Sequence, residues 1–182
     1  MPERYVVFSH GKDGEPWGSK ISAMAELARE EGFHVESVDY RGIDDPRDRV
    51  TRLLAFCKDL RGSLVLVGSS MGGYVTVAAS SLLQARGMFL LAPALYMPGY
   101  EKFSPRPASC TTAIVHGWRD DVIPVDNSIR YAREYKATLH VVDSDHGLLD
   151  QIRAINHYFT YFLFAVEEFL SNPWKKSSPI RP

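Results

Sequence analysis

The sequence predicts an α/β fold, a three-layer α/β/α sandwich built on a mainly parallel sheet of about six strands. Two observations carry this prediction. Short apolar runs, as expected for buried strands, alternate along the chain with segments whose apolar residues recur at helical spacing. The connections between these segments are short, which favours right-handed crossovers between parallel strands. In such sheets ligands bind beyond the carboxyl ends of the strands, so a site is expected in the loops that follow them.

The expected strands are short and rich in apolar residues. The clearest is 64–67, Leu-Val-Leu-Val, and the run at 5–9 is of the same kind, as a strand covered on both faces should be. Segment 34–40 instead alternates apolar with polar residues, which is also typical of a strand. The other expected strands are 88–91, 112–115 and 139–142.

Helices are expected between and after these strands. Apolar residues at helical spacing begin at Ile21, and Gly32 ends that helix. Pro46 suits the first turn of the second helix, which Gly62 closes. The remaining helices are expected at 74–83, which is rich in Ala and Val, at 127–135, and from about residue 150 onward.

The composition limits the classes of protein to consider. The 182 residues, 45% hydrophobic and 24% charged, suit a single globular domain, expected over residues 1–172 and followed by a tail at 173–182. A net charge of −1 gives no electrostatic reason to expect a nucleic acid or a membrane surface as partner. Cys57 and Cys110 lack zinc-site spacing, so no metal is expected. Without a signal segment before Tyr5 or a long apolar span, we expect a cytoplasmic protein.

The strongest chemical signal directly follows the strand at 64–67. Residues 68–72 read Gly-Ser-Ser-Met-Gly and match the pattern Gly-x-Ser-x-Gly with Ser70 at its centre. A tight strand-to-helix turn holds the central residue in a strained conformation that exposes its hydroxyl, and only glycine fits two positions to either side. The helix N-terminus behind the turn supplies N–H groups and a positive dipole. Ser70 is therefore the candidate nucleophile, and Ser69 is a competitor without the flanking glycines.

A serine hydroxyl needs a base and an orienting acid before it can act as a nucleophile. His146 lies in an Asp-His-Gly segment directly after the last strand, where a loop can carry it over the sheet. His116 ends the preceding strand, and Asp120 or Asp121 in the turn after it could accept a hydrogen bond from the imidazole. The order Ser70, aspartate, His146 is the order of one hydrolase fold family. The other candidates, the histidines at 34, 140 and 157, are expected to be merely packed or exposed.

Together these motifs resemble those of the α/β-hydrolases. The matching segments are Ser9-His10-Gly11, residues 39–42, the turn at 68–73, His116-Gly117 with Asp120 and Ile123-Pro124, and Asp145-His146-Gly147. The family's acid stands four residues after the histidine of its turn, so the resemblance selects Asp120 over Asp121. It also implies an oxyanion hole made by the backbone N–H groups of Lys12 and Met71. Because little precedes Tyr5 and no long insertion follows Ala92, it implies a minimal, six-stranded fold without a cap.

The resemblance implies a serine hydrolase that forms an acyl-enzyme on Ser70 and needs no cofactor. A small-molecule ester or thioester is the expected substrate. Apolar and aromatic side chains of the strand-end loops could line its pocket: Trp17, Leu95, Tyr96, Met97, Trp118 and Leu148. Lys12 and Arg119 could pair with a carboxylate or phosphate of the substrate. The long connection at 92–110 is either a pocket wall or small lid, or a plain surface connection.

Other interpretations remain open. The same triad could open a lactone or cut a peptide bond, or the chain could be a catalytically silent interaction protein. A nucleotide-binding protein is disfavoured because residues 11–14 match neither phosphate-loop pattern. On the last helix, Tyr158, Tyr161 and Phe164 form a second aromatic strip, which either is buried within one chain or forms a dimer face. The expected state is therefore a monomer or a homodimer.

Overall fold

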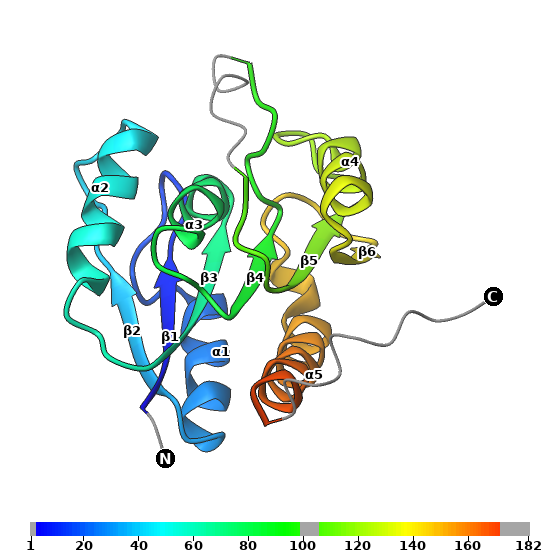
Figure 1. Cartoon of the computed structure of the whole chain (residues 1–182). Coiled ribbons are helices and arrows are strands. Elements are labelled where there is room, and N and C mark those ends of the chain that lie inside the picture. The colour runs from blue at the N-terminus through cyan, green and yellow to red at the C-terminus, as the bar shows by residue number, and fades with distance from the viewer. Residues whose placement is uncertain (1–2, 99–105, 172–182) are drawn as a thin grey trace.

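A computed structural model describes residues 3–98 and 106–171, which form one parallel sheet flanked by helices on both faces (Figure 1). The six strands lie in the order β2-β1-β3-β4-β5-β6, and all neighbouring pairs are parallel. Their bounds are β1 Arg4–Ser9, β2 His34–Val38, β3 Ser63–Ser69, β4 Gly87–Leu91, β5 Thr111–Gly117 and β6 Thr138–Val142. The predicted fold class is confirmed.

The helices form the two outer layers. Their bounds are α1 Ser19–Glu30, α2 Pro46–Cys57, α3 Met71–Ser80, α4 Val125–Tyr135 and α5 Ile152–Ser171, the last preceded by a short 3-10 turn at Leu149–Gln151. α1 and α5 cover one face of the sheet, and α2, α3 and α4 cover the other (Figure 1). The expected tail at 173–182 lies outside the described residues. Across the part of the chain that the structure describes, no helix is both long and apolar enough to cross a membrane.

The strand order brings the predicted motifs to one edge of the sheet. β1 and β3 are neighbours, with Ser9 opposite Gly68 near their carboxyl ends. β5 and β6 are also neighbours, with Gly117 opposite Val142. Because parallel strands end at the same edge, the loops that follow these four strands lie close together. This arrangement places the Gly-x-Ser-x-Gly turn between the loop after β1 and the two loops after β5 and β6.

Each face of the sheet has its own hydrophobic core. Successive residues of β3 point to opposite faces, so Val65 packs toward α1 and α5 while Leu66 packs toward α2 and α3. On the first face Phe159 of α5 lies edge-on to Phe89, with ring centroids 5.1 Å apart. Fully burying a side chain of this size contributes about 1.5–3 kcal/mol. The two cores hold the strand ends, and therefore the loops of the site, in fixed relative positions.

The second aromatic strip on the last helix is divided. Tyr158 packs against the core and stacks on His140, with ring centroids 3.9 Å apart. Tyr161 and Phe164, in contrast, are exposed. Burial of the whole strip within one chain, one of the two expectations, is therefore wrong for these two residues, because they lie on the outer side of α5.

Candidate active site

Ser70 occupies the strained turn between β3 and α3. Its backbone has φ 55° and ψ −121°, a sparsely populated conformation that costs about 1–3 kcal/mol. The turn is held because the Ser70 N–H donates to the Leu91 carbonyl over 2.8 Å. A Cβ on Gly68 would lie 2.4 Å from the Gly72 carbonyl oxygen, and one on Gly72 would lie 2.0 Å from the Ser9 carbonyl oxygen. The flanking glycines are thus required by close backbone approach.

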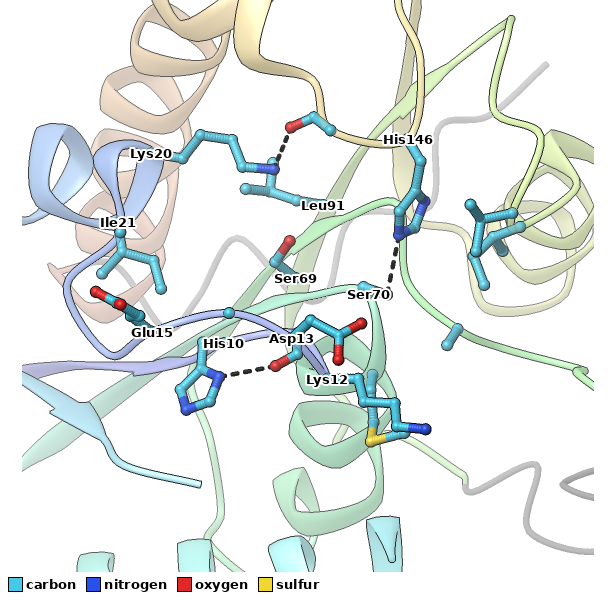
Figure 2. Close-up of a pocket in the computed structure, with 18 of the residues that line it drawn as sticks. His10, Lys12, Asp13, Glu15, Lys20, Ile21, Ser69, Ser70, Leu91 and His146 are labelled. Atoms are coloured by element: carbon cyan, nitrogen blue, oxygen red, sulfur yellow. Dashed lines mark hydrogen bonds between the residues drawn. The ribbon is translucent and has the colours of Figure 1, made fainter. Parts of the chain in front are cut away.

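His146 reaches Ser70 from the loop after β6. Its Nε2 lies 3.0 Å from Ser70 Oγ (Figure 2). Its Nδ1 lies 2.8 Å from Asp120 Oδ2. Because a carboxylate can only accept, Nδ1 carries the proton and Nε2 accepts the hydrogen bond of the serine hydroxyl. The loops after β5 and β6 touch: the Arg119 N–H donates to the Ser144 carbonyl, and a Cβ on Gly117 would lie 2.3 Å from that oxygen. Glycine at 117 therefore allows the loops of Asp120 and His146 to approach each other.

Asp120 is held by four donors. Its Oδ1 accepts from the backbone N–H groups of Val122 at 2.9 Å and Ile123 at 2.8 Å. Its Oδ2 accepts from His146 and also from Nε2 of His116, which lies 3.0 Å away. Burial alone would raise the pKa of Asp120, but the hydrogen bonds from Ile123, His146 and Val122 outweigh it and lower that pKa. Asp120 therefore faces His146 as a carboxylate.

His116 is a fully buried partner of this carboxylate, a role that the sequence analysis did not assign. Its Nε2–H lies within reach of both Asp120 Oδ2 and the Ile123 carbonyl, so Nδ1 accepts from the Ser128 hydroxyl at 2.7 Å. Burial lowers the pKa of His116 despite the nearby carboxylate. The neutral imidazole of His116 thus holds Asp120 at the same oxygen that His146 binds. The spacing of His116 four residues before Asp120 was visible in the sequence, but not this contact.

Two backbone amides lie beside Ser70. A Cβ on Gly11 would lie 3.4 Å from Ser70 Cβ, so the loop after β1 packs directly against Ser70. Met71 is the first residue of α3, and the first N–H groups of a helix lack intrahelical acceptors. Within the described residues, neither the Lys12 N–H nor the Met71 N–H donates to a protein acceptor. Both amides are therefore available to a bound oxygen atom.

A cavity of about 640 Å³ opens in front of Ser70 and His146. Its walls include the expected Met97, together with apolar side chains that the sequence analysis did not select: Ile21, Leu91, Ala94, Pro98, Val122 and Leu149. Ala94, Met97 and Pro98 make the beginning of the long connection at 92–110 a pocket wall. Residues 99–105 of that connection lie outside the described part of the chain.

Five residues that were expected in the pocket lie outside this cavity. Leu95 and Leu148 are buried in the two cores, and Trp17 and Trp118 are exposed beyond the cavity walls. Tyr96 points to α4, where its hydroxyl donates to Glu134. Two of the five occupy turns of left-handed backbone, since Tyr96 and Leu148 have positive φ values, 53° and 54°. A sequence pattern does not reveal such turns in non-glycine residues.

The charged residues near the cavity also differ from expectation. Lys12 lines the cavity, but Arg119 lies outside it and pairs with Asp143 at 2.6 Å. Lys20, which was not predicted, lines the cavity and donates to the carbonyl of Gly147, next to His146 (Figure 2). Burial lowers the pKa of Lys20. Among the described residues, no group of three His, Cys, Asp or Glu side chains is arranged to hold a metal ion.

A parallel sheet with a strained serine turn, a histidine and an aspartate at its carboxyl edge defines a class of hydrolase folds. Residues 6–177 match the alpha/beta hydrolase family, and the chain belongs to that family. The expected resemblance is therefore confirmed. No curated protein matches the chain.

Several solved structures share the fold. A protein from Xanthomonas campestris pv. campestris assigned to the alpha/beta superfamily of hydrolases superposes with a TM-score of 0.84 at 29% identity, covering 90% of this chain and 99% of that one. Est1E from Butyrivibrio proteoclasticus superposes with a TM-score of 0.78 at 16% identity, covering 92% and 89%. A serine hydrolase without a lid, also from Xanthomonas campestris, gives 0.68 at 18% identity, covering 91% and 83%. At these identities the last two show similarity of fold alone.

Proposed function

We propose that this protein is a serine hydrolase that cleaves a carboxylic ester or thioester through an acyl-enzyme on Ser70. One observation carries the proposal. Ser70 Oγ, His146 and Asp120 form a continuous chain of hydrogen bonds of 3.0 and 2.8 Å, and Ser70 and His146 line a cavity. This arrangement can remove the proton of the serine hydroxyl during attack and return it later.

In the first half of the reaction Ser70 Oγ attacks the carbonyl carbon while its proton passes to His146 Nε2. The carbonyl oxygen becomes an oxyanion and accepts hydrogen bonds from the N–H groups of Lys12 and Met71, each worth roughly 3 kcal/mol of barrier. The tetrahedral intermediate collapses, the bond to the leaving oxygen or sulfur breaks, and the leaving group takes the proton from His146. The acyl group is then esterified to Ser70.

In the second half a water molecule attacks the acyl-enzyme. His146 Nε2 takes a proton from the water, and the Lys12 and Met71 amides again bind the oxyanion. Collapse breaks the bond to Ser70 Oγ, which recovers its proton from His146 as the free acid leaves. In both halves Asp120 holds Nδ1–H and stabilises the imidazolium. Its lowered pKa supports this role, because the carboxylate stays ionised when the imidazole gains a proton.

The cavity supports a small substrate with an apolar arm. Its apolar walls can take up an acyl or aryl group. Est1E, one of the proteins that share the fold, is described with ferulic acid bound, and another from Pyrococcus furiosus is described as an esterase. These descriptions favour an ester over a peptide bond as the substrate of this chain.

Labelling with a fluorophosphonate tests the proposal. The wild-type protein is expected to gain one phosphonyl group on the peptide that contains Ser70, and Ser70→Ala is expected to lose it. Ser69→Ala is the matched comparison, because Ser69 is the adjacent serine and also lines the cavity. Labelling that persists in Ser70→Ala and disappears in Ser69→Ala would transfer the nucleophile to Ser69 and contradict the proposal.

A further inference from the structure

Arg49 of α2 is a buried arginine, 1% exposed, whose guanidinium is bonded to backbone carbonyl oxygens. Nε donates to the Ile43 carbonyl at 2.6 Å, and Nη1 and Nη2 donate to three successive carbonyls of the loop after β1: His10 at 3.3 Å, Gly11 at 3.1 Å and Lys12 at 3.2 Å. Within the described residues no carboxylate lies within ion-pair distance of Arg49. Its charge is therefore compensated by the carbonyl dipoles of this loop.

The central carbonyl of the three, that of Gly11, is bound by a second side chain. His10 is buried, and its Nε2 accepts the Tyr40 backbone N–H at 3.0 Å. The proton of the neutral ring therefore sits on Nδ1, which donates to the Gly11 carbonyl at 2.7 Å. Burial lowers the pKa of His10 and so favours this neutral form. Arg49 and His10 together fix the position of the Gly11 oxygen.

A fixed Gly11 oxygen also fixes the amide of the next residue. The Gly11 carbonyl and the Lys12 N–H belong to one planar peptide unit, in which a trans bond makes them point in opposite directions. Arg49 draws the oxygen toward α2 and therefore turns the N–H away from α2. Ser70 packs against the same peptide, since a Cβ on Gly11 would be 3.9 Å from Ser70 Oγ.

We propose that Arg49, assisted by His10, is a positioning residue that orients the Lys12 N–H as an oxyanion donor. The inference rests on the proposed function, because it concerns the amide assigned there to the oxyanion. It explains why an arginine occupies a buried position on α2 where an apolar side chain would cost no desolvation. Without the guanidinium, the Gly11 oxygen keeps the bond from His10 and a 3.3 Å bond from the Gly14 N–H, but nothing among the described residues draws it toward α2, so the peptide unit between Gly11 and Lys12 is less restrained and its N–H can turn out of the site.

The test compares Arg49→Met with Arg52→Met, the same substitution at an exposed arginine of the same helix. For Arg49→Met we expect kcat/KM for p-nitrophenyl acetate to fall at least about 30-fold, and the inhibition constant of phenylboronic acid to rise by a similar factor, because both depend on the oxyanion donors. The midpoint of the pH profile of kcat/KM is expected to stay unchanged, because His146 and Asp120 are untouched. Arg52→Met is expected to match the wild type in all three measurements.

A crystal structure of Arg49→Met gives a readout that does not depend on activity. We expect the peptide unit between Gly11 and Lys12 to be rotated, with the Lys12 N–H no longer directed at Ser70. An unrotated peptide would overturn the inference even if the wild type proved inactive, whereas an inactive wild type would by itself contradict only the proposed function. If Arg49→Met does not fold, Arg49→Lys takes its place, because lysine keeps the charge but reaches fewer carbonyls. We expect Arg49→Lys to show a smaller fall in kcat/KM and a smaller rise in the boronate inhibition constant, with an unchanged pH midpoint. Wild-type kinetics and boronate affinity in a folded Arg49→Lys would overturn the inference.

Discussion

His116 binds the carboxylate of Asp120 at the same oxygen that binds the histidine of the site. His116 Nε2 lies 3.0 Å from Asp120 Oδ2, and His146 Nδ1 lies 2.8 Å from it. The buried His116 cannot move without breaking its bond to the Ser128 hydroxyl. Asp120 is therefore pre-positioned by the core of the protein and holds His146 in place through the shared oxygen. Such preorganisation means that the site needs little rearrangement when a substrate binds.

Replacing Asp120 with asparagine tests the role of the acid. Asp120→Asn keeps the size of the side chain but removes the charge and disturbs the Nδ1–H tautomer of His146. We expect kcat for p-nitrophenyl acetate to fall by about 10³–10⁴-fold. Asp121→Asn is the control, because Asp121 is adjacent, exposed and outside the hydrogen-bond chain. Equal activity of the two variants would show that Asp120 is not the orienting acid.

The buried histidines predict a loss of stability in mild acid. Burial lowers the pKa of both His116 and His10 below the ordinary value of 6.5. The unfolded chain therefore binds these protons first, so the stability is complete above about pH 6.5 and declines as the pH falls toward the lowered values. Each histidine adds at most about 1.4 kcal/mol per pH unit to the slope of the unfolding free energy. Urea titrations across this range measure that slope.

His116→Asn should show a shallower slope than the wild type over the same pH range, because one titrating group is removed. His157→Asn is the control, since His157 lies exposed on α5 and should leave the slope unchanged. A slope in His116→Asn as steep as that of the wild type would contradict the assignment of His116 as a buried neutral imidazole.

The turn that carries Ser70 predicts an unusual effect at Gly72. Glycine to alanine inside a helix ordinarily stabilises by about 1 kcal/mol. In Gly72→Ala, however, the added Cβ would lie 2.0 Å from the Ser9 carbonyl oxygen. We expect the unfolding free energy in urea to fall by about 3 kcal/mol or more, because both groups belong to rigid backbone. Gly18→Ala, whose Cβ would meet its nearest neighbour at 3.8 Å, should change it by less than about 0.5 kcal/mol, and similar losses in the two variants would contradict the argument.

The site residues that the sequence predicts and the structure brings together are those marked by local patterns. The glycines around Ser70 mark a turn that few other residues can form, and the segments of Asp120 and His146 each follow a strand. Once the sheet is parallel, all three must meet at its carboxyl edge. The structure places them within hydrogen-bond distance in the expected order.

The site residues that the sequence did not predict depend on how helices and loops lie in space. Lys20 and Ile21 reach the cavity only because the first turn of α1 lies over the loop of His146. Arg49 lies at helical spacing from the other buried residues of α2, which are Pro46, Leu53 and Cys57. This spacing alone does not predict that Arg49 is buried, because an arginine at such a position usually extends to solvent.

The apolar cavity wall predicts a preference for longer acyl chains. Leu149 lines the cavity and is 60% exposed, so it offers apolar surface to a bound group. For Leu149→Ser we expect the ratio of kcat/KM for p-nitrophenyl butyrate over acetate to fall about 3- to 10-fold, since each buried methylene contributes about 0.8 kcal/mol. Leu82→Ser, at a leucine that is 72% exposed and outside the cavity, should keep the wild-type ratio. An unchanged ratio in Leu149→Ser would place the acyl group elsewhere.

The most direct measurement is a crystal structure of the protein after reaction with a serine-directed phosphonate. The account predicts phosphorus bonded to Ser70 Oγ, with the phosphoryl oxygen accepting hydrogen bonds from the Lys12 and Met71 N–H groups and with His146 still held by Asp120. An adduct on any other residue, or a phosphoryl oxygen directed away from both amides, would contradict it.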